Sequence, residues 1–582
     1  MLPCFSLRQA DLIGVLQAAR MSTEARGGLR ICPLGGLGEV GMNCLALEQR
    51  GSVLLVDCGV TFDHRGLGVD VIHPDFSALE PFRGHLAGVF VTHAHEDHIG
   101  ALPYLLQKHD VPVWAPPYAL GLLRARAEEH EVLAHARFFE ARTRQRFEVG
   151  PFTVEPIRVT HSIADATALA IETDAGLVVH TGDFKFDEAP PDGELLDEDR
   201  LVELGLAGVS LLCSDSTNVD RVGFSGSERG VGEALLRLVR AATGRVVVGL
   251  FASNVHRLRM LGDIARETGR RLVPLGRSVH THSRVAKETG YLAWPETELV
   301  APEMASQLPR EKVLGIATGT QAEANAALAR IARGEHPFVM EPGDTVIFSS
   351  RIIPGHEREV SILTCDLLRR GLRVETRLEE PQVHVSGHAA RGEQERMIEI
   401  TRPRAFLPLH GTLHHLSRHA ALARDLGVPV TCVLEDGEVG TLEAGVLTKT
   451  GRWPSGRVHV GFGRTVAPQV LRERVSLAAG GLAVVVVSID AEGDLADGVD
   501  IVLRGVLEEG AATEVLAGVE RELKRVVGEL SRAERSEDGR VVETVRLAVR
   551  RALARAAGYK PEVVVRVVRV AKTAAEVLPK DE

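Results

Sequence analysis

The segment VFVTHAHEDHIGALPYLL carries four potential metal ligands directly after an apolar run. They are His93, His95, Asp97 and His98. Side chains alternate between the two faces of an extended chain, so the first three project to one side, and His98 joins them if the chain turns into a helix there. Imidazole and carboxylate donors suit Zn²⁺ or Mn²⁺. Because burying such groups without a partner is costly, the segment predicts a metal centre at the end of a strand.

Further donors follow other strand-like runs. His161 follows IRV in VTHSIAD, Asp183 follows GLVVH in HTGDF, and His410 lies at the end of FLPLH. A single histidine after a strand is more often structural than ligating, so each residue is weak evidence by itself. Together with the first segment, they complete a candidate ligand set.

Composition narrows the class of protein. Apolar residues make up 45% and charged residues 25% of the 582-residue chain, which is ordinary for a soluble globular protein. The net charge is −11, and aromatic residues make up only 4%. A passive nucleic-acid binder would be basic and a broad stacking platform would need more aromatic rings, so any nucleic acid must be handled in a local cleft.

The cysteines and the apolar runs indicate a compartment. The seven cysteines are scattered and form no CxxC pair, which argues against a disulfide framework and favours reduced thiols. No apolar run approaches the ~20 residues of a membrane span, and the first residues lack a signal-peptide cleavage site. We therefore expect a cytoplasmic protein with no membrane partner, whose start is either Met1 or Met21.

Alternating strand-like and helix-like segments predict an α/β protein with layered sheets. Short strands with tight turns precede about residue 207 and return after 371, whereas the stretch between them reads as a parallel α/β domain. The last section contains no histidine, and we interpret it as an oligomerisation or packing module. The expected parts are a tail at 1–28, a first domain made of 29–207 and 372–450, an inserted domain at 208–371, a linker at 451–464 and a C-terminal domain at 465–582.

The order of the motifs resembles the β-CASP branch of the metallo-β-lactamase fold, and more narrowly the bacterial ribonuclease J family. HxHxDH by itself indicates only the fold, whereas HVSGH and the long stretch between Asp183 and His410 select the branch. The resemblance implies a metallo-β-lactamase αββα sandwich with an inserted β-CASP α/β domain and a small C-terminal α/β domain. It covers about 30–450 through LGGLGEVGMN, THAHEDHIGALPYLL, THSIAD, HTGDFKFD, CSDSTN, FASNVHR, TGTQAEANAALARIA, IIPGHE, HVSGHA and LPLHG.

The resemblance also implies two divalent metal ions, Zn²⁺ or Mn²⁺, as cofactors. A carboxylate has two oxygens and can bridge two ions, whereas a neutral imidazole cannot. Two cations about 3.5–4 Å apart activate water and stabilise both oxygens of a displacement at phosphorus. The implied ligands are His93, His95 and His161 for one ion, Asp97, His98 and His410 for the other, and Asp183 as the bridge.

HVSGH is the predicted substrate-binding segment. His384, Ser386 and His388 share one face of an extended chain, while Gly387 permits a close backbone approach and Val385 lies between them. Hydroxyl, imidazole and backbone N–H groups together make a phosphate cradle. We expect His388 to act as a general acid or to stabilise the phosphate. The alternative is a simple turn.

Other polar residues also end apolar runs. The resemblance places Asp215, in CSDSTN, in the active site, where it would orient a histidine; the alternative is a helix cap or turn. The predicted catalytic residues are thus Asp97, Asp215 and His388. We expect Asn254 and His256 to contact a substrate phosphate, and Arg257, Arg277 and Arg351 to add positive charge along the groove.

Three positions depart from the family pattern. Thr412 stands where glutamate is usual, His356 where asparagine is usual, and Ala322 where glycine is usual. We expect these residues near the substrate channel, where they would affect substrate preference and rate.

Taken together, the motifs predict a ribonuclease with 5′-to-3′ exonuclease and endonuclease activity on single-stranded RNA, preferring 5′-monophosphate ends and acting in RNA maturation and decay. The expected partners are single-stranded RNA, a second copy of the chain in a homodimer or homotetramer, and an RNA-degradation assembly. The alternatives are a DNA-processing β-CASP nuclease, a small-molecule metallohydrolase such as a thioesterase or lactonase, and a catalytically silent scaffold.

Overall fold

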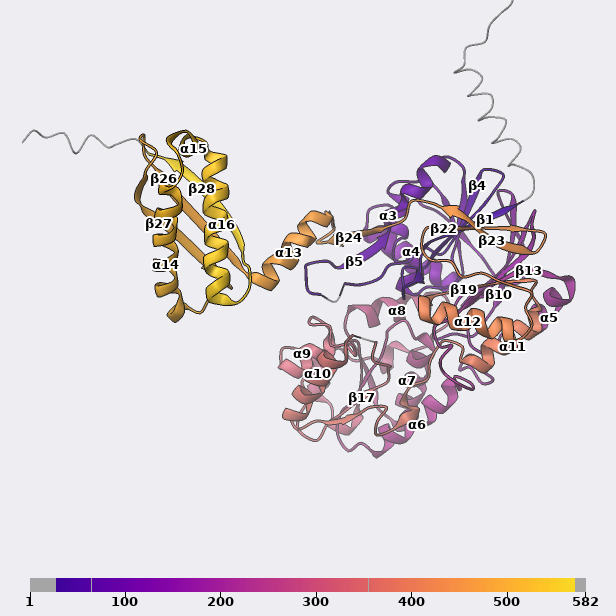
Figure 1. The fold of residues 1–582 in the computed structure, drawn as a ribbon. Coiled ribbons are helices and arrows are strands. Elements are labelled where there is room, and N and C mark those ends of the chain that lie inside the picture. Colours follow the sequence, from indigo (N-terminus) through magenta and orange to yellow (C-terminus); the bar gives the residue numbers. More distant parts are fainter. Residues whose placement is uncertain (1–27, 64, 354, 571–582) are drawn as a thin grey trace, which may run out of the picture. The chain divides into compact units, whose positions relative to one another are not determined.

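The computed structural model describes residues 28–63, 65–353 and 355–570, which fall into two compact units (Figure 1). The larger unit comprises residues 71–458 and the described residues before 64, and the smaller comprises 65–70 and the described residues from 459 onward. Met1, Met21 and nearly all of the predicted tail lie outside the described residues. No helix among the described residues is long and apolar enough to cross a membrane.

Two facing sheets form the core of the larger unit. The first has the order β23-β22-β1-β3-β4-β6-β7-β8, and the second has the order β21-β19-β13-β12-β11-β10-β9. The first contains β1 (Leu29–Gly35), β3 (Cys44–Gln49), β4 (Ser52–Val56), β6 (Leu86–Phe90), β7 (Pro112–Ala115), β8 (Arg137–Glu140), β22 (Glu438–Glu443) and β23 (Val446–Arg452). The second contains β9 (Phe147–Val149), β10 (Phe152–Arg158), β11 (Thr167–Thr173), β12 (Gly176–His180), β13 (Val209–Asp215), β19 (Ala405–Leu409) and β21 (Val430–Thr431).

Alternating apolar residues hold the two sheets together. Leu54 and Val56 of β4 lie in one buried cluster with Leu169 and Ile171 of β11, because residues two apart on a strand face the same side. Helices cover the outer faces, with α4 against β7 and β8, and α5, α11 and α12 against the second sheet. The predicted αββα sandwich is confirmed. Its helices are α2 (Glu96–Ile99), α3 (Leu102–Leu106), α4 (Pro117–Glu129), α5 (Glu198–Ala207), α11 (Arg391–Thr401) and α12 (Leu413–Asp425).

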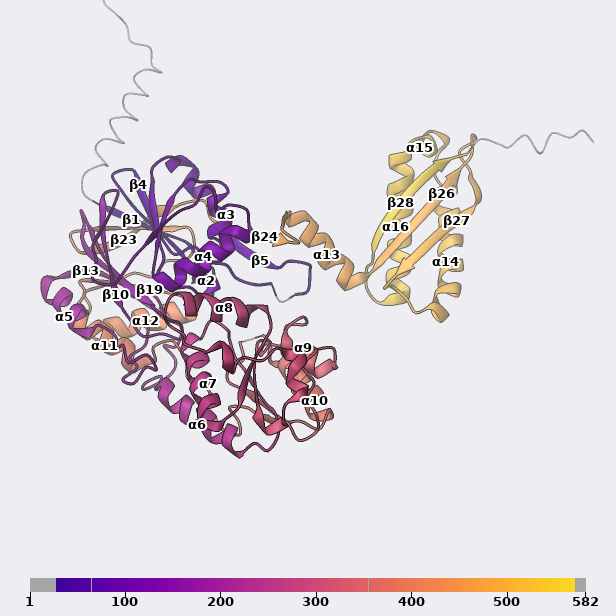
Figure 2. The same cartoon turned by 180° about the vertical axis from the view of Figure 1, so that it is seen from behind.

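A second α/β domain is inserted into this sandwich. Its sheet is entirely parallel, with the order β15-β16-β14-β17-β18, and its helices are visible from behind in Figure 2. The strands are short, and the three central ones, β16, β14 and β17, are buried along their whole length, as expected when both faces are covered. The elements are α6 (Glu228–Ala241), β14 (Val246–Gly249), α7 (Val255–Thr268), β15 (Arg271–Leu275), α8 (Arg277–Glu288), β16 (Val313–Ala317), α9 (Ala327–Arg333), β17 (Thr345–Phe348), α10 (Glu357–Arg369) and β18 (Arg373–Glu375).

The insertion begins later than the sequence suggested. β13 pairs in parallel with β19, so the chain leaves the sandwich only after Asp215, and it has returned by α11, which packs on β13. The boundary predicted at 208 therefore places β13 in the wrong domain. The apolar run VSLLC fits a buried strand of either sheet, so the hydrophobic pattern alone did not separate the two.

Short elements complete the larger unit and the connection that follows it. β2 (Leu37–Gly38) pairs with β20 (Gly411–Thr412). The segment predicted as a plain linker contains β24 (Arg457–Gly461) and the start of β25 (Arg464–Val466), which pair as an antiparallel hairpin. The remaining elements are β5 (Val71–Pro74) and the 3₁₀ turns η1 (Phe76–Phe82), η2 (Glu296–Glu298), η3 (Pro302–Gln307), η4 (Arg310–Lys312) and η5 (Pro381–Val383).

The smaller unit has its own core. Its three-stranded sheet has the order β27-β26-β28, and alternate residues such as Val485 and Val487 pack with Leu523 and Val545 of the helices. The predicted α/β character of the C-terminal part is confirmed. The elements are α13 (Pro468–Gly480), β26 (Leu482–Ile489), β27 (Leu495–Arg504), α14 (Glu509–Gly528), α15 (Arg532–Ser536), α16 (Asp538–Ala557) and β28 (Glu562–Arg569).

Candidate metal centre

The predicted ligands meet just beyond the ends of four strands. β6 ends at Phe90, and the extended residues after it lead into α2, for which His95 is the N-cap residue. His161, Asp183 and His410 follow β10, β12 and β19. His93, His98, His161, Asp183 and His410 are all buried, whereas His95 and Asp97 are partly exposed.

Asp183 lies at the centre of the cluster. Its Oδ2 is 3.6 Å from Nε2 of His93, 3.3 Å from Nε2 of His98 and 3.7 Å from Nε2 of His161. Its Oδ1 is 2.9 Å from Nδ1 of His410. Both oxygens of one carboxylate therefore face imidazole nitrogens, which is the arrangement that a bridging ligand requires.

Hydrogen bonds on the far side of two rings fix which nitrogen faces the cluster. Nδ1 of His98 lies 2.8 Å from Oδ2 of Asp57, and Nδ1 of His161 lies 2.6 Å from the carbonyl oxygen of Gly387. Both partners accept, so both Nδ1 atoms donate a proton. In the neutral rings, Nε2 then carries the lone pair that a metal ion needs.

The same reasoning applies to His93 through one further residue. The Thr92 hydroxyl donates its proton to Oδ2 of Asp57, at 2.8 Å. It therefore accepts from Nδ1 of His93, at 2.9 Å. Three Nε2 atoms, each with a lone pair when its ring is neutral, consequently converge on Oδ2 of Asp183.

The cluster forms overlapping sets of donors. Nδ1 of His95 lies 3.1 Å from Nε2 of both His93 and His161. Oδ2 of Asp97 lies 3.4 Å from Nε2 of His410. The first two sets match the two sets that the resemblance implies. In each set the donor atoms lie within 4.8 Å of one another: His93, His95, His161 and Asp183; Asp97, His98, Asp183 and His410; and Asp183, Asp215, His388 and His410.

The electrostatics of the cluster also suit a cation. Burial lowers the pKa of His93 and of His161, so these rings stay neutral and can ligate. Burial raises the pKa of Asp183, but His410 and His98 outweigh it and hold this pKa well below its usual value. Neutral imidazole nitrogens and carboxylate oxygens converging at these distances form the mixed donor set that Zn²⁺ and Mn²⁺ accept, so the residues fit a divalent metal ion.

Asp57 is a functional residue that the sequence analysis missed. It is buried, and it accepts hydrogen bonds from the Thr92 amide, the Thr92 hydroxyl and Nδ1 of His98, at 2.7, 2.8 and 2.8 Å. It thereby orients His98 directly and His93 through Thr92. The sequence offered one indication of this role: Asp57 directly follows the apolar run SVLLV, and Asp183 and Asp215 were predicted from the same kind of position.

His388 and Asp215 form a pair at the edge of the cluster. Nδ1 of His388 donates to Oδ2 of Asp215 at 2.9 Å, and Oδ1 of Asp215 accepts from the amide and the hydroxyl of Thr217. Burial lowers the pKa of His388, but Asp215 and Asp183 outweigh it and raise this pKa to about 9. Asp215 thus orients the His388 ring and keeps it in the positively charged form at neutral pH.

Ser386 is held by the segment that also carries Asp215. Its hydroxyl oxygen accepts from Nδ2 of Asn218, at 2.8 Å, and from the amide of His388, at 3.2 Å. The hydroxyl proton is then left to donate to a ligand. A side chain at Gly387 would come within 2.9 Å of the His161 ring, so only glycine lets this segment approach the cluster so closely.

His384 is oriented by Arg257. Nη1 of Arg257 lies 3.2 Å from Nδ1 of His384, and because a guanidinium only donates, Nδ1 accepts and Nε2 carries the proton. Arg257 is itself buried and pairs with both oxygens of Glu228, at 2.7 and 3.0 Å. The expectation that Arg257 lines the groove is therefore wrong, because its charge is buried and compensated.

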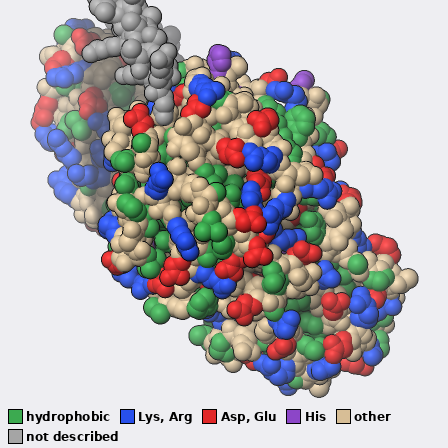
Figure 3. All heavy atoms as spheres, turned by 90° about the vertical axis from the view of Figure 1, so that its right-hand side faces the viewer, with side chains coloured by type: hydrophobic (Ala, Val, Ile, Leu, Met, Phe, Trp, Pro, Cys, Tyr) green, Lys and Arg blue, Asp and Glu red, His purple; other side chains and the backbone are tan. Residues whose placement is uncertain are grey.

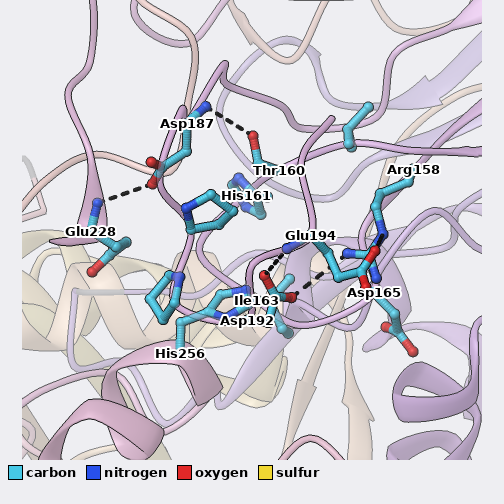
Figure 4. A pocket seen from close by; sticks show the side chains of 13 residues that line it. Arg158, Thr160, His161, Ile163, Asp165, Asp187, Asp192, Glu194, Glu228 and His256 are labelled. Atoms are coloured by element: carbon cyan, nitrogen blue, oxygen red, sulfur yellow. Dashed lines mark hydrogen bonds and ion pairs between the residues drawn. The ribbon is translucent and has the colours of Figure 1, made fainter. Parts of the chain in front are cut away.

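Asn254 is also placed differently from the expectation, and His256 lies in a small cavity. Oδ1 of Asn254 accepts from the Arg257 amide at 3.0 Å and caps α7, so this buried amide group is not available to a phosphate. The buried ring of His256 lines a small cavity with Asp187, Glu228 and other polar side chains (Figure 4). Asn254 is therefore not retained as a phosphate contact, whereas a phosphate contact for His256, whose cavity also contains His161, stays a prediction.

Comparison with known proteins agrees with this geometry. Four family descriptions match: "Beta-lactamase superfamily domain" at 52–203, "Ribonuclease J, beta-CASP domain" at 243–367, "Zn-dependent metallo-hydrolase RNA specificity domain" at 372–433 and "Ribonuclease J C-terminal domain" at 469–570. Ribonuclease J of Mycolicibacterium smegmatis is 40% identical over 87% of this chain and 91% of its own length. The chain belongs to the ribonuclease J family. Ribonuclease J of Sinorhizobium meliloti is 38% identical over 92% of this chain and 97% of its own length.

Membership in the ribonuclease J family makes the protein a metal-dependent nuclease of the hydrolase class. A crystal structure of a protein of unknown function from Enterococcus faecalis V583 shares the fold, with a TM-score of 0.51, 14% identity and coverage of 71% of this chain and 99% of that chain. The predicted family and enzyme class are confirmed, and the buried donor cluster with the zinc-dependent hydrolase match supports divalent metal binding.

The departures from the ribonuclease J pattern have local structural roles. Ala322 has a φ of 62°, in the left-handed region where glycine is favoured, which accounts for the usual glycine. Thr412 is the N-cap of α12 and lies beside His415. Nδ1 of His356 lies 3.1 Å from the carbonyl oxygen of Gln321.

Proposed function

We propose that this protein is a two-metal ribonuclease that cuts single-stranded RNA internally and also degrades it from the 5′ end, with a preference for 5′-monophosphate ends. We further propose that it works in the cytoplasm in RNA maturation and decay, as a homodimer or homotetramer and within an RNA-degradation assembly. The observation that carries the proposal is the convergence of three imidazole lone pairs on Asp183, beside the HVSGH segment.

The residues that would hold the ions are those of the first two donor sets. When bound, two divalent cations lower the pKa of water and stabilise charge on a phosphodiester during displacement. Asp183 belongs to both sets and would bridge, while Asp57 and Gly387 keep His98 and His161 in the ligating tautomer.

The chain's own groups would bind the phosphate and supply a proton. The Ser386 hydroxyl and Nε2–H of His384 are donors for phosphate oxygens, because their other positions are already engaged. His388, with Nδ1 bonded to Asp215, would hold a proton on Nε2 and give it to the departing 3′ oxygen as the phosphorus–oxygen bond breaks. The products would carry a 5′-phosphate and a 3′-hydroxyl.

The test is a cleavage time course on single-stranded RNA labelled at either the 5′ or the 3′ end, with Mn²⁺, Mg²⁺ or Zn²⁺. We expect nucleotide release from 5′-monophosphorylated RNA, slower attack on triphosphorylated RNA, and loss of both in Asp97→Ala and His98→Ala. Asp344→Asn is the matched control, because this buried carboxylate lies in the inserted domain and is absent from the donor sets. Unchanged cleavage in the two ligand variants would refute the metal mechanism.

The same assay separates the alternatives. Faster cleavage of a DNA oligomer of the same sequence would favour a DNA-processing nuclease. Metal analysis of the purified protein alongside the assay would identify the ion, and light scattering would give the number of chains in the assembly.

A further inference from the structure

Three arginine side chains from separate elements gather beside the HVSGH segment. Arg221 lies in the turn after CSDSTN, Arg351 follows β17, and Arg377 follows β18. All three side chains are exposed. Only Arg351 was expected from the sequence to matter, and the other two follow from the fold.

Asn218 ties two of these arginines to the phosphate segment. The Arg221 amide donates to the Asn218 carbonyl at 2.9 Å, which closes the turn. Nη1 of Arg351 donates to Oδ1 of Asn218 at 3.3 Å, and Nδ2 of the same amide donates to the Ser386 hydroxyl at 2.8 Å. One asparagine therefore links both arginines to a group proposed to bind phosphate.

The cluster lacks a negative partner. The Arg221 guanidinium donates to the Ser225 carbonyl and that of Arg351 to the Asn218 side-chain oxygen, and none of the three forms an ion pair with a carboxylate of the described residues. By contrast, acidic and basic side chains are interspersed on the face seen in Figure 3. Partial burial of the Arg377 guanidinium lowers its pKa, and the nearby Arg221 and Arg351 lower it further. Burial lowers the pKa of His384, and Arg257, Arg377 and Arg351 lower it further, so these arginines lie near enough to act on the HVSGH segment. Like charges held together without a counter-ion, in a chain of net charge −11, indicate an anion site.

We propose that Arg221, Arg351 and Arg377 bind a second phosphate of single-stranded RNA, next to the phosphate held by HVSGH. The inference rests on the proposed function, because it takes the neighbouring site to hold RNA. Planar guanidinium groups donate two parallel hydrogen bonds to a phosphate and are the preferred side chains for this purpose. Phe224, 60% exposed and three residues after Arg221, adds a ring on which a base can stack.

The test is equilibrium binding, which is independent of catalysis. A fluorescently labelled, 5′-phosphorylated single-stranded RNA of roughly 12 nucleotides is titrated with the full chain in EDTA, at several salt concentrations. The variant is Arg221→Gln, Arg351→Gln and Arg377→Gln combined. The control combines Arg259→Gln, Arg333→Gln and Arg369→Gln, which removes the same charge from exposed positions on helices of the inserted domain.

We expect the test variant to bind RNA at least about tenfold more weakly at low salt, and the slope of log affinity against log salt to become shallower by about 0.7 for each lost phosphate contact. The control should keep the wild-type slope, and both should keep the wild-type melting temperature. Equal slopes for wild type and test variant would overturn the inference. That result would be expected if these arginines bound an acidic protein partner and not RNA.

A separate measurement distinguishes this inference from the proposed function. The same variants are assayed for cleavage of a dinucleotide and of a longer RNA in the presence of metal. If the test variant loses cleavage of the longer RNA alone, the result supports a separate phosphate site. If it loses cleavage of both substrates equally, the arginines belong to the reaction centre and the inference is overturned. Wild-type protein that binds RNA with the expected salt dependence but never cleaves it refutes the proposed function and leaves the binding result standing.

Discussion

Replacing Asp57 with asparagine tests how the metal centre is organised. Oδ1 accepts from the Thr92 amide, and Oδ2 accepts from both the Thr92 hydroxyl and Nδ1 of His98. An asparagine keeps only one acceptor oxygen. If that oxygen faces the Thr92 amide, the NH₂ group opposes the N–H of His98; if it faces His98, the NH₂ group opposes the Thr92 amide.

Either orientation leaves one buried donor without an acceptor, which costs about 1–3 kcal/mol. In the first orientation His98 also loses the bond that keeps the proton on Nδ1, so Nε2 is no longer a dependable ligand. Losses of this kind typically weaken metal affinity about 10–100-fold. We therefore expect Asp57→Asn to fold with a lower melting temperature and to bind Zn²⁺ or Mn²⁺ at least about tenfold more weakly.

The assay is a competition titration with a chelator of known affinity, with metal content measured after dialysis. Asp344→Asn is the control, because Asp344 is a buried carboxylate that accepts from the Arg245 amide at 2.8 Å but lies in the inserted domain. It should lower stability without changing metal affinity. Wild-type metal affinity in Asp57→Asn would refute the argument that Asp57 fixes the ligating tautomer.

Three further predictions follow from buried groups. Asp215→Asn should lower kcat on RNA about 10²–10⁴-fold at unchanged metal content, because the one oxygen left is needed by the Thr217 amide and the NH₂ group then opposes Nδ1–H of His388; an unchanged kcat would contradict this role. Arg257→Met leaves the buried carboxylate of Glu228 unpaired and should cost about 3–5 kcal/mol in denaturant unfolding, whereas a cost below about 1 kcal/mol would show that the pair is dispensable. Burial raises the pKa of Asp165 from 3.8 to about 7, so its contribution to stability is complete below 3.8 and is lost as pH rises through 7. The melting temperature of the wild type should therefore fall more than that of Asp165→Asn between about pH 5 and 8, and an opposite difference would refute the assignment.

The sequence identified the ligand cluster because its chemistry is local. Donors placed at the ends of apolar runs must emerge where strands end, and a sandwich gathers such ends on one side. His161 and His410 were therefore expected to join His93 although they are far away in the chain, and the structure brings them together. The order of the strands, by contrast, could not be read from the apolar runs, which is why β13 was assigned to the inserted domain.

Roles that depend on a distant partner were not predictable. Arg257 looked like a groove residue until Glu228, on another helix, was found against it. Asn254 stands before a helix, and its capping role depends on where α7 begins. Asp57 carried the same signal as Asp183, but only the contact with His98 reveals its function. Burial and pairing, rather than residue type, decided each of these cases.

The pairing of β13 with β19 has a consequence for engineering. Parallel neighbours need a crossover, and α11 supplies it by leading into β19. At the start of α11, the Arg391 amide donates to the Arg221 carbonyl at 2.9 Å, so a few residues could close the gap near this pair if the insert between them were excised. The trimmed sandwich would keep Asp215, α11 and every ligand from His93 to His410, while losing Ser386 and His388. A scaffold that holds the metal ions but lacks the groups proposed to bind RNA would then be open to a new substrate. The loop grafted at the junction would decide which substrate binds.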